Sequence, residues 1–195
     1  MSLDRVRAYL HETSRVVERT AEEQGDAIVR AAELVTASVR DGGRILLCGN
    51  GGSAGDAQHL ATEFVSTLTR DRRRPAIPAV ALTTDTSLLT AVANDFGFEE
   101  VFARQVEALG REGDVLIGIS TSGRSPNVLR AVELARDRDL RTIGLSGSSG
   151  GSLASLVDVA IRVPSEETSH IQEGHIAVGQ LIAFLAEDAL FPADG

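Results

Sequence analysis

The sequence contains few aromatic residues and almost no sulfur. Among its 195 residues there is no Trp, one Tyr, one Met and one Cys, and Phe and Tyr bring the aromatic share to only 4%. A core without large rings has to be built from Leu, Ile, Val and Ala, which suits helices packed on a parallel sheet. Because Cys48 stands alone, neither an internal disulfide nor a cage of cysteine ligands is possible. We therefore expect an α/β protein of the cytoplasm.

Positive charge and long apolar runs are also scarce. The chain has 19 Lys and Arg against 28 Asp and Glu, and the resulting net charge of −9 argues against a broad nucleic-acid surface. No apolar run reaches the roughly 18 residues needed to cross a bilayer. Residues 1–18 combine acidic side chains with amphipathic spacing, so they do not resemble a signal peptide. We expect neither a membrane nor a nucleic acid as a partner.

The chain does contain a regular alternation of short apolar runs and helical patterns. Five runs end in small polar residues and are typical of buried strands: residues 44–49, 79–84, 114–120, 141–146 and 158–163. Parallel strands need long crossovers, nearly all of them right-handed, so five strands with helices on both faces is the simplest architecture. The sequence therefore predicts a single α/β domain over residues 1–195, with the strand order 2-1-3-4-5.

Both ends of the chain are predicted to be helical. Residues 1–40 carry apolar side chains at intervals of three to four, and we expect two helices there, broken near residues 23–25. From about Ser169 to Leu190 the apolar stripe is too broad for a lone surface helix, because apolar side chains would be left in water. We therefore expect the ends to serve in packing and assembly, and the protein to be a homo-oligomer.

A glycine-rich loop follows the first predicted strand and opens a helix. Its backbone and polar groups come from Gly49, Asn50, Gly51, Gly52 and Ser53. Glycines let the backbone approach a ligand closely, and the free N–H groups of a first helical turn attract an anion. A tight turn capped by Ser53 is the simpler alternative. The first loop is therefore a candidate anion site.

The first loop also satisfies the relaxed dinucleotide fingerprint through Gly49, Gly51 and Ala54. That fingerprint requires an acidic residue at the end of the next strand, about 20 residues on. The nearest candidate, Asp85, comes too late. A P-loop is excluded because no G-x-x-x-x-G-K-[ST] sequence is present.

A second polar loop follows the third predicted strand. It carries Ser120, Thr121, Ser122, Gly123 and Ser125, and Pro126 marks the start of the next helix. Hydroxyl and backbone donors around a glycine can hold a phosphate without Lys or Arg, although a hydroxyl-rich turn with a helix cap is the alternative. Two such loops at the carboxyl edge of one sheet predict a binding site for a phosphorylated small molecule.

Acid–base candidates lie on the helix after the first loop. His59 and Glu63 are four residues apart, which places them on one face of that helix. A solvated surface contact is the alternative explanation for such a pair. Its position beside the first loop favours a role in the site.

Other polar residues are weaker candidates. Asn94 and Asp95 are predicted to lie in a break between helical stretches, where they could face a pocket or simply form a turn. The last helix offers His170, Gln172, His175 and Gln180, and single histidines in such a place are more often structural than catalytic. Residues 71–75 are predicted to form a solvated basic turn.

Four motifs in this order and spacing resemble one known family. They are GNGGSAGDAQH (49–59), TAVANDFGFEEVFARQ (90–105), STSGRSPNVLRA (120–131) and HIQEGHI (170–176). The chain resembles the bacterial sedoheptulose-7-phosphate isomerases of the sugar isomerase (SIS) superfamily over nearly its whole length. The resemblance implies a flavodoxin-like αβα sandwich, homotetramers with active sites at subunit interfaces, and zinc in several members. It also implies conversion of sedoheptulose 7-phosphate to D-glycero-D-manno-heptose 7-phosphate through an enediol, in nucleotide-activated heptose biosynthesis.

The resemblance assigns roles by position. Glu63 matches the catalytic base, and His59, Glu63 and Gln172 match metal ligands. Substrate contacts would come from Asn50, Gly51, Gly52, Ser53, Glu63, Asn94, Asp95 and Gln172, and the phosphate would be held by Ser120, Thr121, Ser122 and Ser125. The remaining metal and acid–base position is usually His but is Gln180 here. An amide does not titrate near neutral pH and is a poorer zinc ligand than imidazole, so we expect weakened zinc binding and turnover.

Gln180 leaves other functions open. The chain could be a catalytically impaired SIS homologue that binds a sugar phosphate, or a replication-initiator-associating protein that uses the same scaffold as a docking platform. It could also be an isomerase of a related, longer ketose phosphate. Retention of His59, Glu63 and Gln172 favours catalysis, whereas Gln180 favours its loss.

Overall fold

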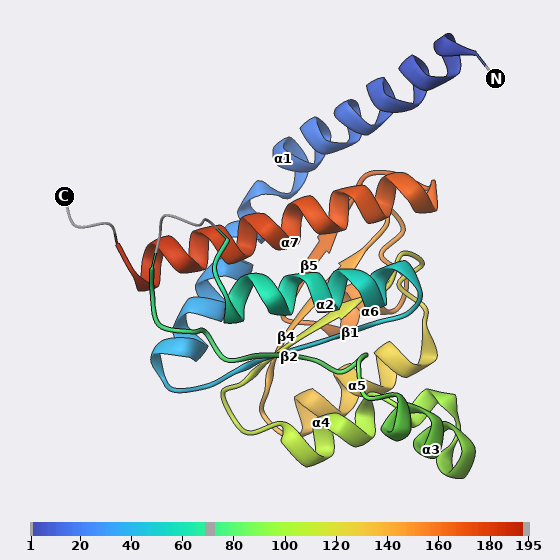
Figure 1. Ribbon diagram of the computed structural model, residues 1–195. Coiled ribbons are helices and arrows are strands. Elements are labelled where there is room, and N and C mark those ends of the chain that lie inside the picture. Colours follow the sequence, from blue (N-terminus) through green and yellow to red (C-terminus); the bar gives the residue numbers. More distant parts are fainter. Residues whose placement is uncertain (1, 69–72, 193–195) are drawn as a thin grey trace.

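The computed structural model describes residues 2–68 and 73–192, and its centre is one sheet of five parallel strands (Figure 1). The strands are β1 (Ile45–Gly49), β2 (Ala79–Ala81), β3 (Val115–Ile119), β4 (Arg141–Ser146) and β5 (Val159–Arg162). Their order is β2-β1-β3-β4-β5, which confirms the predicted order. Each strand lies inside one of the five predicted apolar runs, so the predicted α/β class is confirmed as well.

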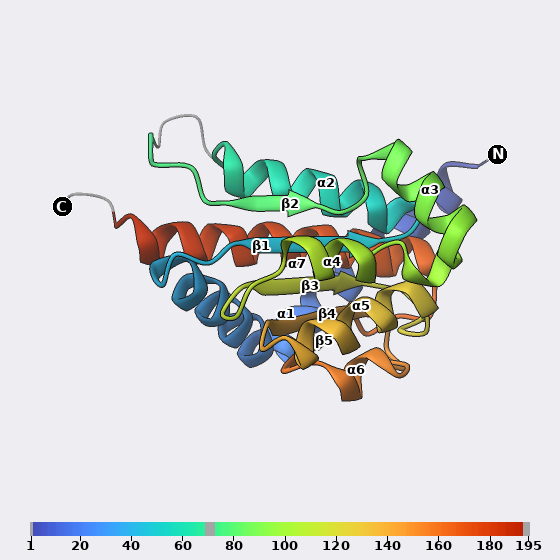
Figure 2. The ribbon, with the colours of Figure 1, turned by 90° about the horizontal axis from the view of Figure 1, so that it is seen from below.

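Helices cover both faces of the sheet, as Figure 2 shows from below. One face carries α1 (Leu3–Arg40), α2 (Gly52–Val65) and α7 (Thr168–Leu190). The other carries α3 (Thr86–Phe96), the 3-10 helix η1 (Phe98–Glu100), α4 (Ala103–Leu109), α5 (Pro126–Asp137) and α6 (Leu153–Leu156). None of the described helices is both long enough and apolar enough to span a bilayer.

Strand β1 separates two cores because successive side chains of a strand point to opposite faces. Ile45 and Leu47 pack under α1, α2 and α7, and Leu46 and Cys48 pack under α4 and α5. All four side chains are fully buried. Burial raises the pKa of the Cys48 thiol to about 12, so this cysteine acts as a small core residue and stays unreactive.

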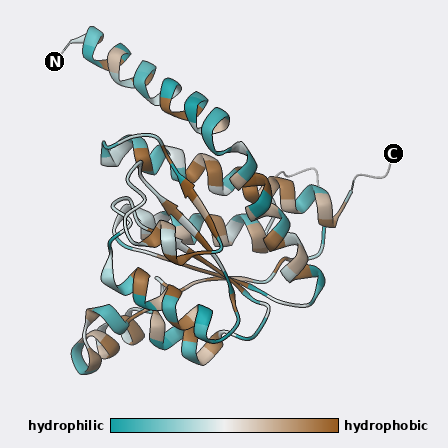
Figure 3. Cartoon of the chain, turned by 180° about the vertical axis from the view of Figure 1, so that it is seen from behind, coloured by the Kyte–Doolittle hydropathy of each residue, from teal (hydrophilic) through white to brown (hydrophobic). Residues whose placement is uncertain are grey.

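The first helix differs from the sequence prediction. Helix α1 runs unbroken for 38 residues, so the predicted break near residues 23–25 is wrong. A glycine inside a helix costs only about 1 kcal/mol relative to Ala. At Gly25 that cost is offset because Val16 on one side and Ile28 and Val35 on the other are buried against the rest of the fold. The amino-terminal part of α1 extends beyond the sheet (Figures 1 and 3).

Helix α7 lies between α1 and α2, and small residues let it approach its neighbours closely. A Cβ added to Gly179 would lie 2.4 Å from Leu60 of α2, and one added to Gly174 would lie 2.7 Å from Val163. The broad apolar stripe predicted for this segment is partly used in this packing. Leu181 and Phe184 remain exposed, so the stripe extends beyond the contacts within one chain.

Candidate active site

The two predicted loops meet at the carboxyl edge of the sheet. Strands β1 and β3 are paired up to Gly49 and Ile119, so both loops leave the sheet at the same level. Directly after β1, the side-chain amide of Asn50 exchanges two hydrogen bonds of 2.8 Å with that of Asn127 on α5. This pair joins the first loop to the helix that the second loop opens, and the predicted convergence is confirmed.

The first loop turns sharply at Gly51. This residue is the N-cap of α2 and has a φ of +56°, a conformation that favours glycine. Ser53 is buried inside the first turn of the helix and makes no cap, so the alternative of a turn capped by Ser53 is wrong. A Cβ on Gly49 would lie 2.7 Å from the Ser53 carbonyl oxygen, which shows how closely the loop folds back on the strand end.

The second loop brings its hydroxyl groups together. Ser120 is buried, and its Oγ lies 2.9 Å from the Oγ of Ser125. The backbone N–H of Gly123 donates to the Ser120 carbonyl and closes the turn between them. Ser125 is the N-cap of α5 but gives no side-chain cap, so its hydroxyl is available to the loop. Thr121 and Ser122 complete the group of hydroxyls.

A third loop, which the sequence analysis missed, supports the second. Residues 147–152 follow β4, and the Gly147 N–H donates to the Thr121 carbonyl. Gly123 has a φ of +63°, and a Cβ on it would lie 2.1 Å from the Gly150 carbonyl oxygen. The signal for this loop was present in the sequence, because three glycines and three serines follow a predicted strand.

The second and third loops border a cavity of about 250 Å³ beside the start of α7. Most of its lining residues carry hydroxyl groups or expose backbone: Thr121, Ser122, Gly147, Ser148, Ser149, Ser165, Glu166, Thr168 and Ile171. The cavity therefore extends the polar surface of the second loop toward α7.

Helices α2 and α7 bring three predicted catalytic side chains together. His59 Nε2 lies 3.0 Å from Glu63 Oε1, and Gln180 Nε2 of α7 lies 3.1 Å from the same His59 nitrogen. The Glu63 side chain is 16% exposed and that of His59 is 49% exposed, so the carboxylate is the more sheltered of the two. The structure thus places the His59 imidazole between the Glu63 carboxylate of α2 and the Gln180 amide of α7.

Asp56 is a further acidic residue near this cluster, and the sequence analysis did not single it out. It lies on α2, three residues before His59. Burial raises its pKa, and the nearby His59 opposes that shift in part. Within the described parts of the chain, its buried Oδ2 has no hydrogen-bond partner. The sequence did contain a signal for Asp56, because it is the one acidic residue in the motif at 49–59.

Gln172 is the fourth predicted metal ligand, and it lies at the first loop. A Cβ added to Gly52 would lie 2.1 Å from Gln172 Nε2. The absence of a side chain at residue 52 is therefore what lets the Gln172 amide rest on the start of α2.

We expect Gly52→Ala to lower the rate of the isomerisation that the sequence predicts, with little loss of stability. The new methyl group would meet the flexible end of Gln172, which can move aside and so leaves the fold intact. The amide would then be displaced from the loop. Turnover and thermal unfolding of the variant, compared with Gly55→Ala, check this, because a Cβ at Gly55 meets no atom within 4 Å. Equal turnover of both variants would remove Gln172 from the site.

The four predicted metal-ligand positions form a poor donor set for zinc. Among the described residues there is no group of three His, Cys, Asp or Glu side chains arranged to hold a metal ion. His59 and Glu63 supply one imidazole and one carboxylate, and the remaining two positions, Gln172 and Gln180, supply only amides. Zinc prefers thiolate, imidazole and carboxylate ligands, so these residues do not fit a usual zinc site.

Asn94 and Asp95 lie in the last turn of α3, ahead of the break at Gly97 in which they were predicted. Both are exposed, and the Asn94 amide donates to the Asp95 carboxylate over 2.7 Å. The helix continues through them because Gly97, with a φ of +100°, provides the stop. A role for this pair in substrate binding stays a prediction.

The basic tract at 71–75 is not simply a solvated turn. Residues 71 and 72 lie outside the described residues, but Arg74 is well defined by its contacts. Its side chain is 2% exposed, and its Nε lies 2.6 Å from a carboxylate oxygen of Glu187, which is equally buried. The prediction of a solvated turn is wrong at Arg74 because Glu187 of α7, more than 100 residues later, neutralises its charge.

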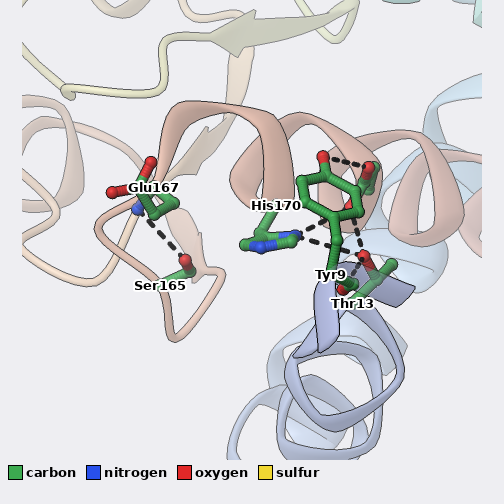
Figure 4. Close-up of polar contacts among 6 residues, drawn as sticks. Tyr9, Thr13, Ser165, Glu167 and His170 are labelled. Atoms are coloured by element: carbon green, nitrogen blue, oxygen red, sulfur yellow. Dashed lines mark hydrogen bonds and ion pairs between the residues drawn. The ribbon is translucent and has the colours of Figure 1, made fainter. Parts of the chain in front are cut away.

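A polar junction, drawn in Figure 4, fastens α1 to α7 beside Gln172. The Tyr9 hydroxyl and the Thr13 hydroxyl each donate to the Glu173 carboxylate over 2.8 Å, and His170 Nδ1 lies 3.0 Å from the same carboxylate. Burial alone would raise the pKa of Glu173, but the hydrogen bonds from His170, Tyr9 and Thr13 together lower it. His170 therefore has a structural role, which the sequence analysis gave as the more common one for a single histidine in such a place.

Comparison with known proteins agrees with this geometry. Residues 8–147 match the SIS domain family. Phosphoheptose isomerase of Roseiflexus sp. is 54% identical over 90% of this chain and 88% of its own. The chain belongs to the phosphoheptose isomerase family of SIS-domain proteins. The enzyme of Rhodospirillum rubrum is 56% identical over 84% of this chain and 86% of its own.

Solved structures of phosphoheptose isomerases have the same fold. That from Neisseria gonorrhoeae superposes with a TM-score of 0.89 at 45% identity, covering 95% of this chain and 98% of its own. That from Francisella tularensis gives 0.91 at 38% identity, covering 96% and 99%. The similarity extends over both loops and over α2 and α7, so the site described above lies inside the shared fold.

Proposed function

We propose that this chain is an aldose–ketose isomerase that converts sedoheptulose 7-phosphate to D-glycero-D-manno-heptose 7-phosphate, as in nucleotide-activated heptose biosynthesis. The contacts of His59 with Glu63 on α2 and with Gln180 on α7 carry this proposal. They unite a base with an imidazole and with an amide of the neighbouring helix α7. The names of relatives about 50% identical over most of the chain give the same activity.

The isomerisation transfers one proton between neighbouring carbons. Glu63 takes a proton from C1 of the ketose, the electrons form the C1–C2 double bond of an enediol, and the protonated carboxyl then delivers a proton to C2. The negative charge that develops on the C2 oxygen requires a donor, and the amide of Gln180, which contacts His59, can supply an N–H group. His59, in contact with Glu63, can move the proton between the two hydroxyl oxygens.

The phosphate fixes the far end of the sugar. Ser120 and Ser125, joined through their hydroxyls, together with Thr121, Ser122 and the backbone near Gly123, offer donors without any cation. Such a cradle suits a chain of net charge −9, because it attracts the dianion only locally. Anchoring the phosphate orients C1 and C2 at Glu63 and turns binding energy into rate.

Zinc binding is part of the proposal only in a weakened form. Only His59 and Glu63 would offer zinc its usual ligands here, because Gln172 and Gln180 supply amides. Because this donor set fits zinc poorly, the residues themselves carry the proton transfer described above.

We expect Gln180→His to raise both zinc binding and turnover. The new imidazole would add a strong ligand and a group that titrates near neutral pH beside His59. Zinc per chain, measured after dialysis against a fixed zinc concentration, should increase, and the isomerisation rate should increase with it. Unchanged zinc content and rate would rule out an acid–base or ligand role at residue 180.

The activity itself is tested with purified sugar phosphate. Incubation with sedoheptulose 7-phosphate should yield the aldose, detected by NMR of the C1 proton, and in D₂O the product should carry deuterium at C2. Binding of the sugar phosphate without any conversion would instead support the catalytically impaired homologue. A longer ketose phosphate assayed in parallel tests whether the heptulose is the preferred substrate.

We also propose that the chain is a homotetramer of the cytoplasm. Apolar side chains are exposed along the outer part of α1 and on α7: Leu3, Val6, Leu10, Val17, Leu181 and Phe184. An apolar groove between the two helices, lined by Val17, Ile28, Val178 and Leu181 among others, continues this surface. Further copies of the chain would cover it in the proposed tetramer. Light scattering on the eluting protein should give four times the chain mass of 20.6 kDa.

A further inference from the structure

Arg74 joins the helix that carries the proposed base to the helix that carries Gln180. Its Nη2 donates to the Glu63 carbonyl oxygen over 2.8 Å, and its Nη1 donates to the Phe64 carbonyl oxygen over 2.8 Å. Its Nε pairs with Glu187 of α7 over 2.6 Å. One guanidinium therefore contacts the end of α2 on one side and α7 on the other.

These contacts supply hydrogen-bond donors to the carbonyl groups at the end of α2. The last carbonyl groups of a helix have no partner within the helix, and α2 ends at Val65. Arg74 supplies donors to two of them, Glu63 and Phe64. The ring of Phe191, after the end of α7, lies 5.8 Å from the guanidinium carbon and covers it. The planar fork of Arg fixes these directions in a way that the single ammonium of Lys cannot.

The same contacts bear on the site geometry. Glu187 lies seven residues after Gln180, which is about two turns, so both face the same side of α7. On α2, Glu63 contributes its backbone oxygen to Arg74 and its carboxylate to His59. Arg74 and Glu187 thus set the position of α2 along α7, and that position decides whether Gln180 reaches His59.

Stability of the fold does not by itself explain why an ion pair is buried here. A buried pair loses about as much in desolvation as it gains in attraction, and replacing both partners by apolar residues often leaves stability unchanged or improves it. Arg74 and Glu187 are both 2% exposed at their side chains. We propose that Arg74, paired with Glu187, is a positioning residue for the isomerisation. This inference rests on the proposed function.

The test replaces the pair without leaving a buried charge. In Arg74→Met with Glu187→Met, the midpoint of urea unfolding should stay close to that of wild type. The value of kcat for sedoheptulose 7-phosphate should nevertheless fall about 10- to 100-fold, because a shift of about 1 Å at a base has that effect. KM should change less than about threefold, since the hydroxyl loops that hold the phosphate do not contact Arg74.

Two further variants complete the experiment. Arg74→Lys keeps the charge and thus the fold, yet it should also lower kcat because an ammonium cannot replace the fork at both carbonyls. Val132→Ala, a core truncation on the opposite face of the sheet, should lose stability and keep kcat. Native kcat in both the Met pair and Arg74→Lys would overturn the inference. An inactive wild type would instead refute the proposed function, so the two failures are distinguishable.

Discussion

Replacement of the proposed base should have the largest effect of any single substitution. In Glu63→Gln, kcat should fall by about 10²- to 10⁴-fold, the usual contribution of a positioned general base. The amide keeps the shape of the side chain and can still contact His59, but it cannot accept the proton from C1. KM should change little, because the phosphate is held by the hydroxyl loops. Steady-state assays with sedoheptulose 7-phosphate measure both quantities.

The matched control for this substitution is Glu107→Gln. Glu107 pairs with Arg104 on α4, which covers the opposite face of the sheet, and its side chain is 49% exposed. Its loss should leave kcat and KM as in wild type. Deuterium incorporation from D₂O should stop in Glu63→Gln as well, since no other carboxylate has been placed at the sugar carbons. A Glu63→Gln enzyme with more than about a tenth of wild-type kcat would show that another residue takes the proton.

Acidification should destabilise the protein through His175. This side chain is fully buried on α7, and in the described structure neither ring nitrogen has a partner at hydrogen-bonding distance. Burial lowers its pKa to about 4, although the nearby Ser146 backbone opposes the shift in part. The unfolded chain therefore binds a proton more readily than the folded chain between about pH 6.5 and pH 4.

The sign of the effect follows from that difference. The contribution of His175 to stability is complete above its unfolded pKa and is lost as the pH falls toward its folded pKa. Between pH 7.5 and pH 5, the free energy of unfolding should decrease by about 2 kcal/mol on its account. Urea unfolding at a series of pH values measures this slope at fixed protein concentration. His175→Leu should flatten it, because a leucine cannot titrate.

The control for the pH series is Val132→Ala, because it truncates a buried core side chain without removing a titratable group. This variant should lose stability at every pH and keep the wild-type slope. If His175→Leu and wild type lose stability in parallel as the pH falls, a different buried group must bind the proton.

Much of the fold could be predicted from local pattern. The five strands were visible because each is a short apolar run that ends in small polar residues, which is typical of buried parallel strands. The expected order of the strands is confirmed as well, although the handedness of the crossovers does not fix it by itself. The prediction of a break in α1 was wrong, although it rested on local pattern in the same way as the correct prediction of the strands. Local pattern shows a glycine, but it does not show the packing at Ile28 and Val35 that offsets its cost.

The candidate site was also predictable only in part. Sequence spacing by itself placed His59 and Glu63 on one helix face, and placed hydroxyl loops after strands that must share an edge. It could not show that Gln180 of α7 reaches His59, because no rule of spacing relates residues 121 positions apart.

Tertiary structure alone decided three features of this protein. It buried Arg74 against Glu187, placed a third loop beneath the second, and left His175 without a partner inside the core. Each depends on two segments that meet only when the helices pack on the sheet. Composition and spacing indicate which elements form, since helical hydrogen bonding and the periodicity of side chains act locally. Contacts between distant elements decide which of their side chains are buried, paired and held in the geometry that a reaction requires.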